Sequence, residues 1–355
     1  MSETFLKPED QMMQWITSKW ISKPIHVAAE FGIADLLRDK PMSVEKLAQR
    51  TETHAPTLFR LLRALSAVGI FAEIDDQVFD LTPLAQCLCS EAMRPLALMF
   101  LSDWHDKVWS NLTYSVRTGK PGFDHAFGKG AFEWMEENPE ARSILDQGQG
   151  LKAIGFAEAV IEAYDLSGFN SICDVGGGQG AFLIQLLANY PHIKGIVADL
   201  PGAVVSAEKA IAKAGFHDRC KAIHYDFLKE APPVCDAYFL VNVLHDWDDE
   251  TCCRILSNIS QTMNVDSRLL IIEFLLELGH DFSVAKLLDI EVLVMGGGRE
   301  RTVDEYKALL GSVGLAISRV IPTSRGPALL ECTAEQMITS GKRNIGKDSG
   351  KVKPE

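Results

Sequence analysis

Apolar positions recur at helical spacing through the first part of the chain and then alternate briefly around a turn. Ser43 stands where a helix N-cap belongs, and Gly69 stands where a helix would end. The alternating stretch brackets Asp75 and Asp76, which favours a hairpin. The predicted elements are helices over 1–22, 24–37, 43–49 and 56–68, and strands over 70–74 and 77–81. Helices followed by a hairpin are typical of a winged-helix unit.

Residues 91–165 keep a mostly helical pattern, broken by glycine and proline at 118–122. From Asn170 onward, short apolar runs alternate with helical segments. The predicted strands lie at 171–175, 195–199, 222–225, 237–243 and 269–273. Such alternation predicts an α/β fold with a doubly wound, Rossmann-like parallel sheet after the mainly helical N-terminal part. The last residues, 336–355, are rich in Ser, Gly and Lys, which predicts a disordered tail.

The composition fits a globular protein with two domains, or one domain with a large appendage, because 47% of the 355 residues are hydrophobic. No apolar run approaches the ~20 residues of a membrane helix, and the polar start is unlike a signal peptide. The eight cysteines form no C-x-x-C pair, so we expect buried small side chains rather than a zinc site. These features predict a cytoplasmic protein without a membrane partner.

The charge balance argues against a nucleic-acid partner for the winged-helix unit. The whole chain carries a net charge of −13. Residues 24–90 carry six Lys or Arg and nine Asp or Glu, and the predicted hairpin itself holds Glu73, Asp75 and Asp76. A DNA-binding module needs a basic face. A winged-helix regulator that senses a small ligand is therefore only a minor alternative.

A glycine-rich loop, Asp174-Val-Gly176-Gly-Gly178-Gln-Gly180, follows the first predicted strand of the sheet and opens a helix. Glycines let a ligand approach the backbone, and a helix N-terminus favours anionic groups. The loop satisfies both the dinucleotide pattern and the pattern of S-adenosylmethionine enzymes, and a tight turn without ligand is a third interpretation. Asp199, at the end of the second strand, could accept hydrogen bonds from ribose hydroxyls in either liganded case.

Four further segments favour the interpretation of the glycine loop as that of an S-adenosylmethionine enzyme. They are Asp199-Leu-Pro201, Asp226-Phe-Leu, Val243-Leu-His-Asp-Trp-Asp-Asp-Glu250 and Gly297-Gly-Arg-Glu-Arg-Thr302. With the glycine loop, in this order and spacing, the chain resembles the plant-type small-molecule O-methyltransferases, which include caffeic acid and acetylserotonin O-methyltransferases, over roughly residues 15–335.

The resemblance implies a class I methyltransferase fold and a homodimer. It divides the chain into a winged-helix-like dimerisation domain at 1–105, a helical connector that forms part of the acceptor pocket at 106–165, and an S-adenosylmethionine-binding catalytic domain at 166–335. It also implies that S-adenosylmethionine becomes S-adenosylhomocysteine without help from a metal. Gly176, Gly178 and Asp199 would bind this cofactor, Asp226 would accept from the adenine amine, and Phe227 would cover the ring.

The resemblance assigns His245 as the general base, with the carboxylates of Glu273 and Glu300 beside it. Methyl transfer needs an aligned nucleophile and a base with a pKa near neutrality, which histidine supplies. A carboxylate beside the imidazole would orient the ring and stabilise the imidazolium. A histidine here could otherwise be a packing or capping residue, and Glu300 a surface charge. Glu273 lies in an apolar run, where a buried acid needs a partner or a function.

Four residues are candidates for the acceptor site: Asp246, Trp247, Glu291 and Met295. Glu291 departs from the family pattern, in which an uncharged residue is common, so we expect it to contact a polar or cationic part of the acceptor or to pair with a local cation. The acids Asp248, Asp249 and Glu250 are typical of a capped first helical turn. A metal site is the alternative for this acidic run, and we expect none.

The sequence therefore predicts an S-adenosylmethionine-dependent O-methyltransferase. The expected acceptor is a hydroxyl, phenolic by resemblance, on a small aromatic or polyketide-like molecule. Two rival enzymes stay open: one that uses the same cofactor site for hydroxylation or decarboxylation, and an NAD-dependent oxidoreductase that rests on the glycine loop alone.

Overall fold

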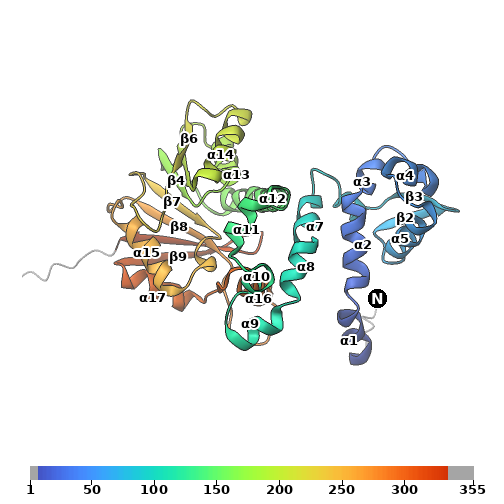
Figure 1. Cartoon of the computed structure of the whole chain (residues 1–355). Helices are drawn as coiled ribbons and strands as arrows, with labels where there is room; N and C mark the ends of the chain where they lie inside the picture. The colour runs from blue at the N-terminus through green and yellow to red at the C-terminus, as the bar shows by residue number, and fades with distance from the viewer. Residues whose placement is uncertain (1–6, 335–355) are drawn as a thin grey trace, which may run out of the picture.

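A seven-stranded sheet forms the centre of the C-terminal half of the chain (Figure 1). The computed structural model describes residues 7–334. The strand order is β6-β5-β4-β7-β8-β10-β9. The strand bounds are β4 Ser171–Val175, β5 Lys194–Asp199, β6 Cys220–His224, β7 Ala237–Val241, β8 Arg268–Glu273, β9 Leu315–Pro322 and β10 Ala328–Ala334. Strands β4 to β8 are parallel, which confirms the predicted doubly wound sheet.

Two strands, β9 at the edge of the sheet and β10 beside it, were not predicted. β10 pairs antiparallel with β8 and with β9. The apolar run that begins β10 is interrupted by Glu331, which masks the strand pattern in the sequence. Glu331 is nevertheless buried, because Arg319 on β9 and Arg268 on β8 form ion pairs with it. A buried charge that is paired across strands carries no hydrophobic signature.

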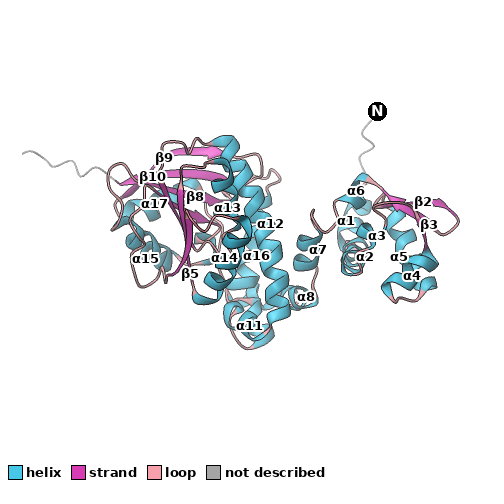
Figure 2. Ribbon diagram, turned by 90° about the horizontal axis from the view of Figure 1, so that it is seen from above, coloured by secondary structure: helices cyan, strands magenta, loops and turns pink. Residues whose placement is uncertain are grey.

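Helices cover both faces of this sheet (Figure 2). One core cluster packs α15 and α17 on the first face, and another packs α12, α13 and α14 on the second. Their bounds are α12 Pro139–Ala163, α13 Ala181–Asn189, α14 Pro201–Ala214, α15 Asp249–Ser260 and α17 Val303–Ser312. The carboxyl ends of β4, β5 and β7 lead directly into the predicted motifs, as ligand sites in open α/β sheets require.

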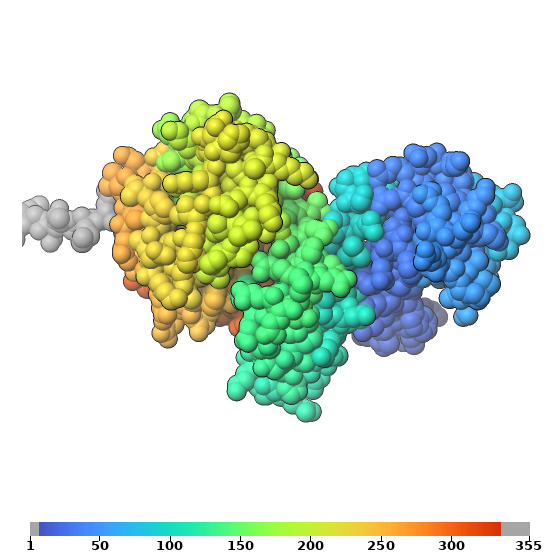
Figure 3. All heavy atoms as spheres, turned by 45° about the horizontal axis from the view of Figure 1, so that its top comes forward, coloured from blue at the N-terminus to red at the C-terminus, as the bar shows by residue number. Residues whose placement is uncertain are grey.

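The N-terminal part is a separate helical cluster with a small sheet of order β1-β3-β2. Its elements are α1 Pro8–Ile16, α2 Lys19–Glu30, α3 Ile33–Leu36, β1 Met42–Ser43, α4 Val44–Thr51, α5 Ala55–Ala67, β2 Phe71–Asp75, β3 Val78–Leu81 and α6 Pro83–Gln86. The predicted hairpin and the Ser43 cap are confirmed, since the Ser43 side chain accepts a hydrogen bond from the backbone nitrogen of Lys46. Figure 3 shows this cluster at one end of the molecule.

The predicted boundary between the first two helices was wrong. The chain breaks at Thr17–Ser18 rather than before Pro24, and Pro24 lies inside α2. The Thr17 hydroxyl donates to the carbonyl of Met13, which gives the backbone an alternative to continuing the helix. The second helix also ends early, because Gly32 adopts a left-handed conformation with φ of 62°. Residues 1–6 of the first predicted helix and the predicted tail lie outside the described residues.

Short helices connect the two parts, as the pattern over residues 91–165 predicted. They are α7 Arg94–Phe100, α8 Asp103–Trp109, α9 Leu112–Thr118, α10 Gly122–Phe127 and α11 Ala131–Glu137. A fourth core cluster joins α8, α10, α11 and α12 to α16, which spans Val284–Gly296. This packing places α8 beside α16 (Figure 1). Within residues 7–334, no helix is both long and apolar enough to span a membrane.

Candidate active site

The glycine loop is an open backbone cradle between β4 and α13. Gly176, Gly178 and Gly180 all have positive φ, at 72°, 56° and 76°. A Cβ on Gly177 would lie 2.6 Å from the carboxylate of Asp174, whereas a Cβ on Gly178 would meet nothing within 4 Å. The loop therefore needs glycine for its conformation and leaves free space in front of Gly178.

Two acids, Asp174 and Asp199, adjoin this loop. The backbone nitrogen of Gly178 donates to Asp199 at 2.7 Å, which joins the end of β5 to the loop. Asp174 is buried, and neither of its carboxylate oxygens has a hydrogen-bond partner. Burial, and then the charge of Asp199, raise the pKa of Asp174 to about 7. Buried polar atoms without partners point to a missing donor, so the cradle is built for a ligand with hydrogen-bond donors.

Asn242 and Phe227 lie beside the same loop. Asn242 follows β7 in a left-handed conformation with φ of 51°, and its side-chain amide has no partner. A Cβ on Gly176 would lie 3.5 Å from the Phe227 ring, which shows that this ring closes one side of the cradle. Asn242 could not be recognised as a site residue from the sequence, because a lone amide after a strand belongs to no motif.

Asp226 makes local contacts instead. One carboxylate oxygen accepts from the backbone nitrogen of Leu228 at 3.0 Å, and the other lies 2.7 Å from Lys229 Nζ. The hydrogen bond from Lys229 holds the pKa of Asp226 below its usual value, although burial raises it slightly. These contacts cap the turn that follows β6. They leave the adenine contact expected for Asp226 as a proposal.

His245 lies in the 3-10 helix η1, Leu244–Asp246, just beyond β7, and three acids surround it. Its Nδ1 donates to Glu300 at 2.8 Å and lies 3.6 Å from Glu273. Its Nε2 lies 3.6 Å from Asp246. Burial alone would lower the pKa of His245, but Glu273, Asp246 and Glu300 together raise it to about 9. The three residues expected to act together are therefore close enough to do so.

The two buried glutamates hold different parts of this histidine. Glu300 orients the ring, while Glu273 at the end of β8 accepts from the backbone nitrogens of Leu244 and His245, at 2.9 and 3.3 Å. Burial raises the pKa of Glu273 to about 7 even though the charge of His245 opposes that rise. Among the described residues, the three side chains His245, Glu273 and Glu300 are also the one group close enough to hold a metal ion.

Arg301 joins the two motifs and was missed by the sequence analysis. Its buried guanidinium donates to the carbonyl oxygens of Leu244 and Trp247, at 2.9 and 2.7 Å, and to Asp249 at 2.8 Å. The backbone nitrogen of Arg299 donates to the carbonyl oxygen of His245 at 2.8 Å. An arginine between two motif residues was the available signal, but a sequence does not show which carbonyls it can reach.

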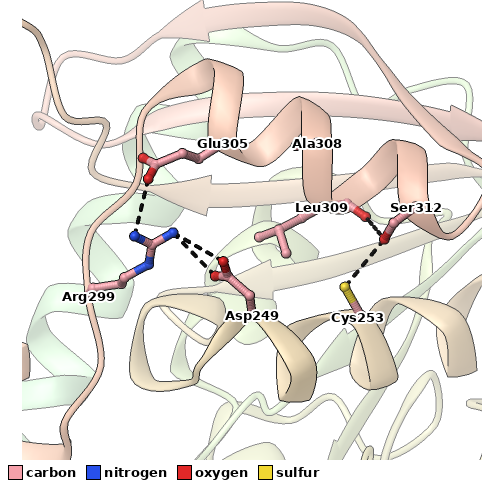
Figure 4. Close-up of a pocket in the computed structure, with 7 residues that line it drawn as sticks. All are labelled: Asp249, Cys253, Arg299, Glu305, Ala308, Leu309 and Ser312. Carbon is pink, nitrogen blue, oxygen red and sulfur yellow. Dashed lines mark hydrogen bonds and ion pairs between the residues drawn. The ribbon is translucent and has the colours of Figure 1, made fainter.

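The acidic run after His245 serves the helix that follows. Asp248 caps α15 by accepting from the backbone nitrogen of Thr251 at 2.8 Å, as predicted. Asp249 pairs with Arg301 and with Arg299, which also contacts Glu305 at the rim of a small surface pocket (Figure 4).

The four residues proposed for the acceptor site differ in how they contact the rest of the protein. Both oxygens of Glu291 on α16 are engaged, since His105 Nε2 and Trp109 Nε1 on α8 donate to them at 2.8 and 2.7 Å. Glu291 is thus paired within the protein, with a histidine and a tryptophan in place of the expected cation, and its contact with the acceptor stays a prediction. Met295 packs with the α8 and α10 cluster, and Trp247 packs edge-on against Phe227. Asp246 lies 3.6 Å from His245 Nε2.

Comparisons with known proteins add independent evidence. The chain matches the model of the O-methyltransferase dimerisation domain at residues 13–91 and that of the O-methyltransferase domain at 109–316. It is 38% identical to a phenazine O-methyltransferase from Lysobacter antibioticus, over 90% of this chain and 94% of that one. It is 35% identical to the mitomycin biosynthesis 6-O-methyltransferase of Streptomyces lavendulae, over 90% and 92% of the two chains.

Solved structures agree with these sequence relatives. The crystal structure of LaPhzM matches with a TM-score of 0.88 and 37% identity, covering 93% of this chain and all of that one. The chain is also similar to a relative named for a different activity, the aclacinomycin 10-hydroxylase of Streptomyces purpurascens, with 31% identity over 83% of this chain and 81% of that one.

Proposed function

We propose that His245 deprotonates a phenolic hydroxyl on a small aromatic or polyketide-like acceptor. The chain belongs to the O-methyltransferase family and is an S-adenosylmethionine-dependent O-methyltransferase. The observation that carries this proposal is the 2.8 Å hydrogen bond from His245 Nδ1 to Glu300. It fixes the ring and leaves Nε2 for the acceptor. The phenazine and mitomycin activities of the relatives support an aromatic or quinone-like acceptor.

The residues of the glycine loop fit the cofactor. Gly176 and Gly178 would let its amino-acid and ribose parts approach the backbone, and Asp199 would accept from ribose hydroxyls. The unpartnered carboxylate of Asp174 would accept from an ammonium group. Phe227 would cover the adenine, and Asp226 would contact the adenine amine. When bound, the sulfonium supplies an electrophilic methyl group, and we propose that no metal takes part.

The acids around His245 make the imidazolium the stable form in the cofactor-free protein, because its pKa is raised to about 9. A base must be neutral before it takes a proton. A positive charge brought near the ring opposes the acids and lowers this pKa. Glu300 and Glu273 then stabilise the imidazolium that forms when the acceptor loses its proton. Positioning of the acceptor oxygen in line with the methyl group supplies the remaining part of catalysis.

The N-terminal part supports a homodimer. Large apolar side chains on α1 and α2 are exposed, with Trp15 at 63%, Ile16 at 68% and Trp20 at 75%. Such a patch on one surface favours association with a second copy. We therefore propose that residues 1–105 dimerise, that 106–165 connect and help to form the acceptor pocket, and that 166–335 bind the cofactor. The eight free cysteines are in keeping with a reducing, cytoplasmic location.

A second candidate function is hydroxylation or decarboxylation at the same cofactor site, which the similarity to the aclacinomycin 10-hydroxylase favours. The complete set of His245, Glu273 and Glu300 favours O-methylation, because each of these groups assists proton removal. Direct identification of the product, by mass, separates the two. A gain of one methyl group supports the proposal.

Calorimetric titration with S-adenosylmethionine, S-adenosylhomocysteine and NAD is the first test. We expect both sulfur nucleotides, and not NAD, to bind. Methyl transfer to a panel of phenols follows, with His245→Ala beside the unchanged protein. The variant should keep its cofactor affinity and lose turnover by ~10²–10⁴. Equal loss of affinity and turnover would instead identify a structural histidine.

A further inference from the structure

The loop at 297–301 lies between α16 and η1 and is held by a run of four consecutive backbone nitrogens. The first two donate to carbonyl oxygens at the end of α16, at 3.1 and 3.2 Å, and the third donates to the carbonyl oxygen of His245 at 2.8 Å. The fourth nitrogen, that of Glu300, donates to the carboxylate of Asp289 at 2.8 Å. Asp289 is therefore the one side chain in this run of acceptors, and it serves the residue whose carboxylate contacts His245.

Asp289 occupies a position that packing alone does not explain. It lies in the middle of α16, between Leu288 and Ile290, and it is half-buried. Aspartate is a poor helix former, and a half-buried carboxylate without a cation is poorly solvated. Within residues 7–334 its side chain forms no ion pair, and its hydrogen bond goes to the nitrogen of Glu300. This contact is thus what the acid provides at this position.

The carboxylate of Glu300 has no anchor besides the histidine. The residue is buried, one of its oxygens accepts from His245 Nδ1 at 2.8 Å, and the other has no partner among the described residues. Its place beside the ring therefore follows from the place of its own backbone. A displacement of that backbone lengthens or misaligns the hydrogen bond to Nδ1, and such bonds weaken steeply when they are misaligned.

Asp289 and the acceptor candidate Glu291 contact different neighbours. Because they are two residues apart on a helix, they project about 200° from each other around its axis. Glu291 contacts His105 and Trp109 on α8, whereas Asp289 contacts the loop. Helix α16 thus joins an acceptor candidate on one side to the backbone of Glu300 on the other.

We propose that Asp289 is a positioning residue, which holds the backbone of Glu300 so that its carboxylate orients His245 for proton removal. This proposal rests on the proposed function, because it takes His245 as the base. Asp289 needs only an oxygen that accepts from the nitrogen of Glu300, so its negative charge is dispensable. A side chain without an acceptor leaves that nitrogen unpaired and the carboxylate of Glu300 free to turn away from the ring.

Replacement of Asp289 separates this role from a merely structural one. Asp289→Ala removes the acceptor, and kcat for the phenol that the unchanged protein methylates fastest should fall about 10–100-fold, the cost of a misplaced catalytic group. Asp289→Asn keeps an oxygen in place and should retain kcat within about threefold. Both variants should bind S-adenosylhomocysteine with the affinity of the unchanged protein, which shows that they fold. Should Asp289→Ala fail to bind it, Asp289→Glu takes its place, since the added methylene displaces the acceptor.

Two further readouts concern the histidine itself. In the cofactor-free protein, the proton NMR signal of His245 Nδ1 reports its hydrogen bond to Glu300, so it should weaken or shift in Asp289→Ala and persist in Asp289→Asn. In a double-mutant cycle, Asp289→Ala added to Glu300→Ala should lower kcat by less than about threefold further. Asp218→Ala, which removes an acid whose side chain is 89% exposed ahead of β6, is the matched control and should change none of these quantities.

An undiminished kcat in Asp289→Ala, an equal loss in Asp289→Asn, or a full additional loss beside Glu300→Ala would overturn the role of Asp289. The NMR comparison needs no acceptor and is therefore independent of the proposed function. If the unchanged protein methylates no phenol while the Nδ1 signal responds as expected, the proposed function is refuted and the positioning of Glu300 by Asp289 is supported.

Discussion

Replacing Glu300 by glutamine tests how the buried acids set the pKa of His245. Glutamine keeps the shape and can still accept from Nδ1, but it removes one negative charge 2.8 Å from the ring. An opposite charge at such a distance moves a pKa by ~1–3 units. Glu273 and Asp246 stay in place, so we expect the pKa of His245 to fall from about 9 to ~7–8.

This shift has two opposite effects on the rate. At pH 7 only ~1% of a group with a pKa of about 9 is neutral, whereas a pKa of ~7.5 leaves ~25% neutral. The rising limb of the kcat/KM profile should therefore move to lower pH. The plateau at high pH should be lower in Glu300→Gln, because the imidazolium that forms during proton transfer is less stabilised.

The assay is the pH dependence of kcat/KM, followed by S-adenosylhomocysteine formation, together with an NMR titration of the His245 ring. The ring signal is needed because the pKa of Glu273 is raised to about 7, and two coupled groups give macroscopic values. Glu250→Gln is the matched control, since Glu250 is an acid on the adjoining helix α15 whose side chain is 87% exposed. A His245 pKa that stays within ~0.3 units of the unchanged protein, or that rises, would refute this electrostatic reasoning.

Three further predictions concern the same region. Gly177→Ala places a Cβ 2.6 Å from the Asp174 carboxylate, which must distort the loop. The affinity of this variant for S-adenosylhomocysteine, measured by calorimetry, should fall by about tenfold or more, and an unchanged affinity would contradict the role of the loop. Arg301→Met leaves the carbonyl oxygens of Leu244 and Trp247 without their donor, and chemical denaturation should show a loss of about 2–4 kcal/mol in unfolding free energy. The cofactor-free protein should lose stability as pH rises from about 6.5 to about 9, because the folded-state pKa of His245 is raised, and thermal melts across that range that show no decline would contradict it.

The sheet and its motifs could be predicted because local sequence determines them. The parallel strands were found within two residues of their observed starts, since each is a short apolar run that ends at a turn. The break between α1 and α2 was misplaced for a physical reason. Trp15, Ile16 and Trp20 face outward there, and a pattern of apolar residues does not tell a core-facing helix from one that awaits a partner.

Only those site residues that belong to recognisable sequence motifs could be predicted. His245, Glu273 and Glu300 come together because each follows a strand or loop at the same edge of the sheet. His105 belongs to a helix, α8, and the rotation of a helix about its axis decides where its side chains point. Packing between elements far apart in the chain fixes that rotation, so the contact of His105 with Glu291 could not be predicted from its surroundings in the sequence.

The contact between η1 and the loop at 297–301 has an evolutionary consequence. A Cβ on Gly298 would overlap the carbonyl oxygen of His245, and Arg301 ties the same loop to both ends of η1. The base and its orienting acid thus form one rigid module. The acceptor candidates Glu291 and Met295 lie on α16, which packs against α8, outside this module. Directed evolution confined to the face of α16 that carries these two residues should diversify the acceptors while proton abstraction is retained, whereas changes within 297–301 should abolish turnover of every acceptor alike.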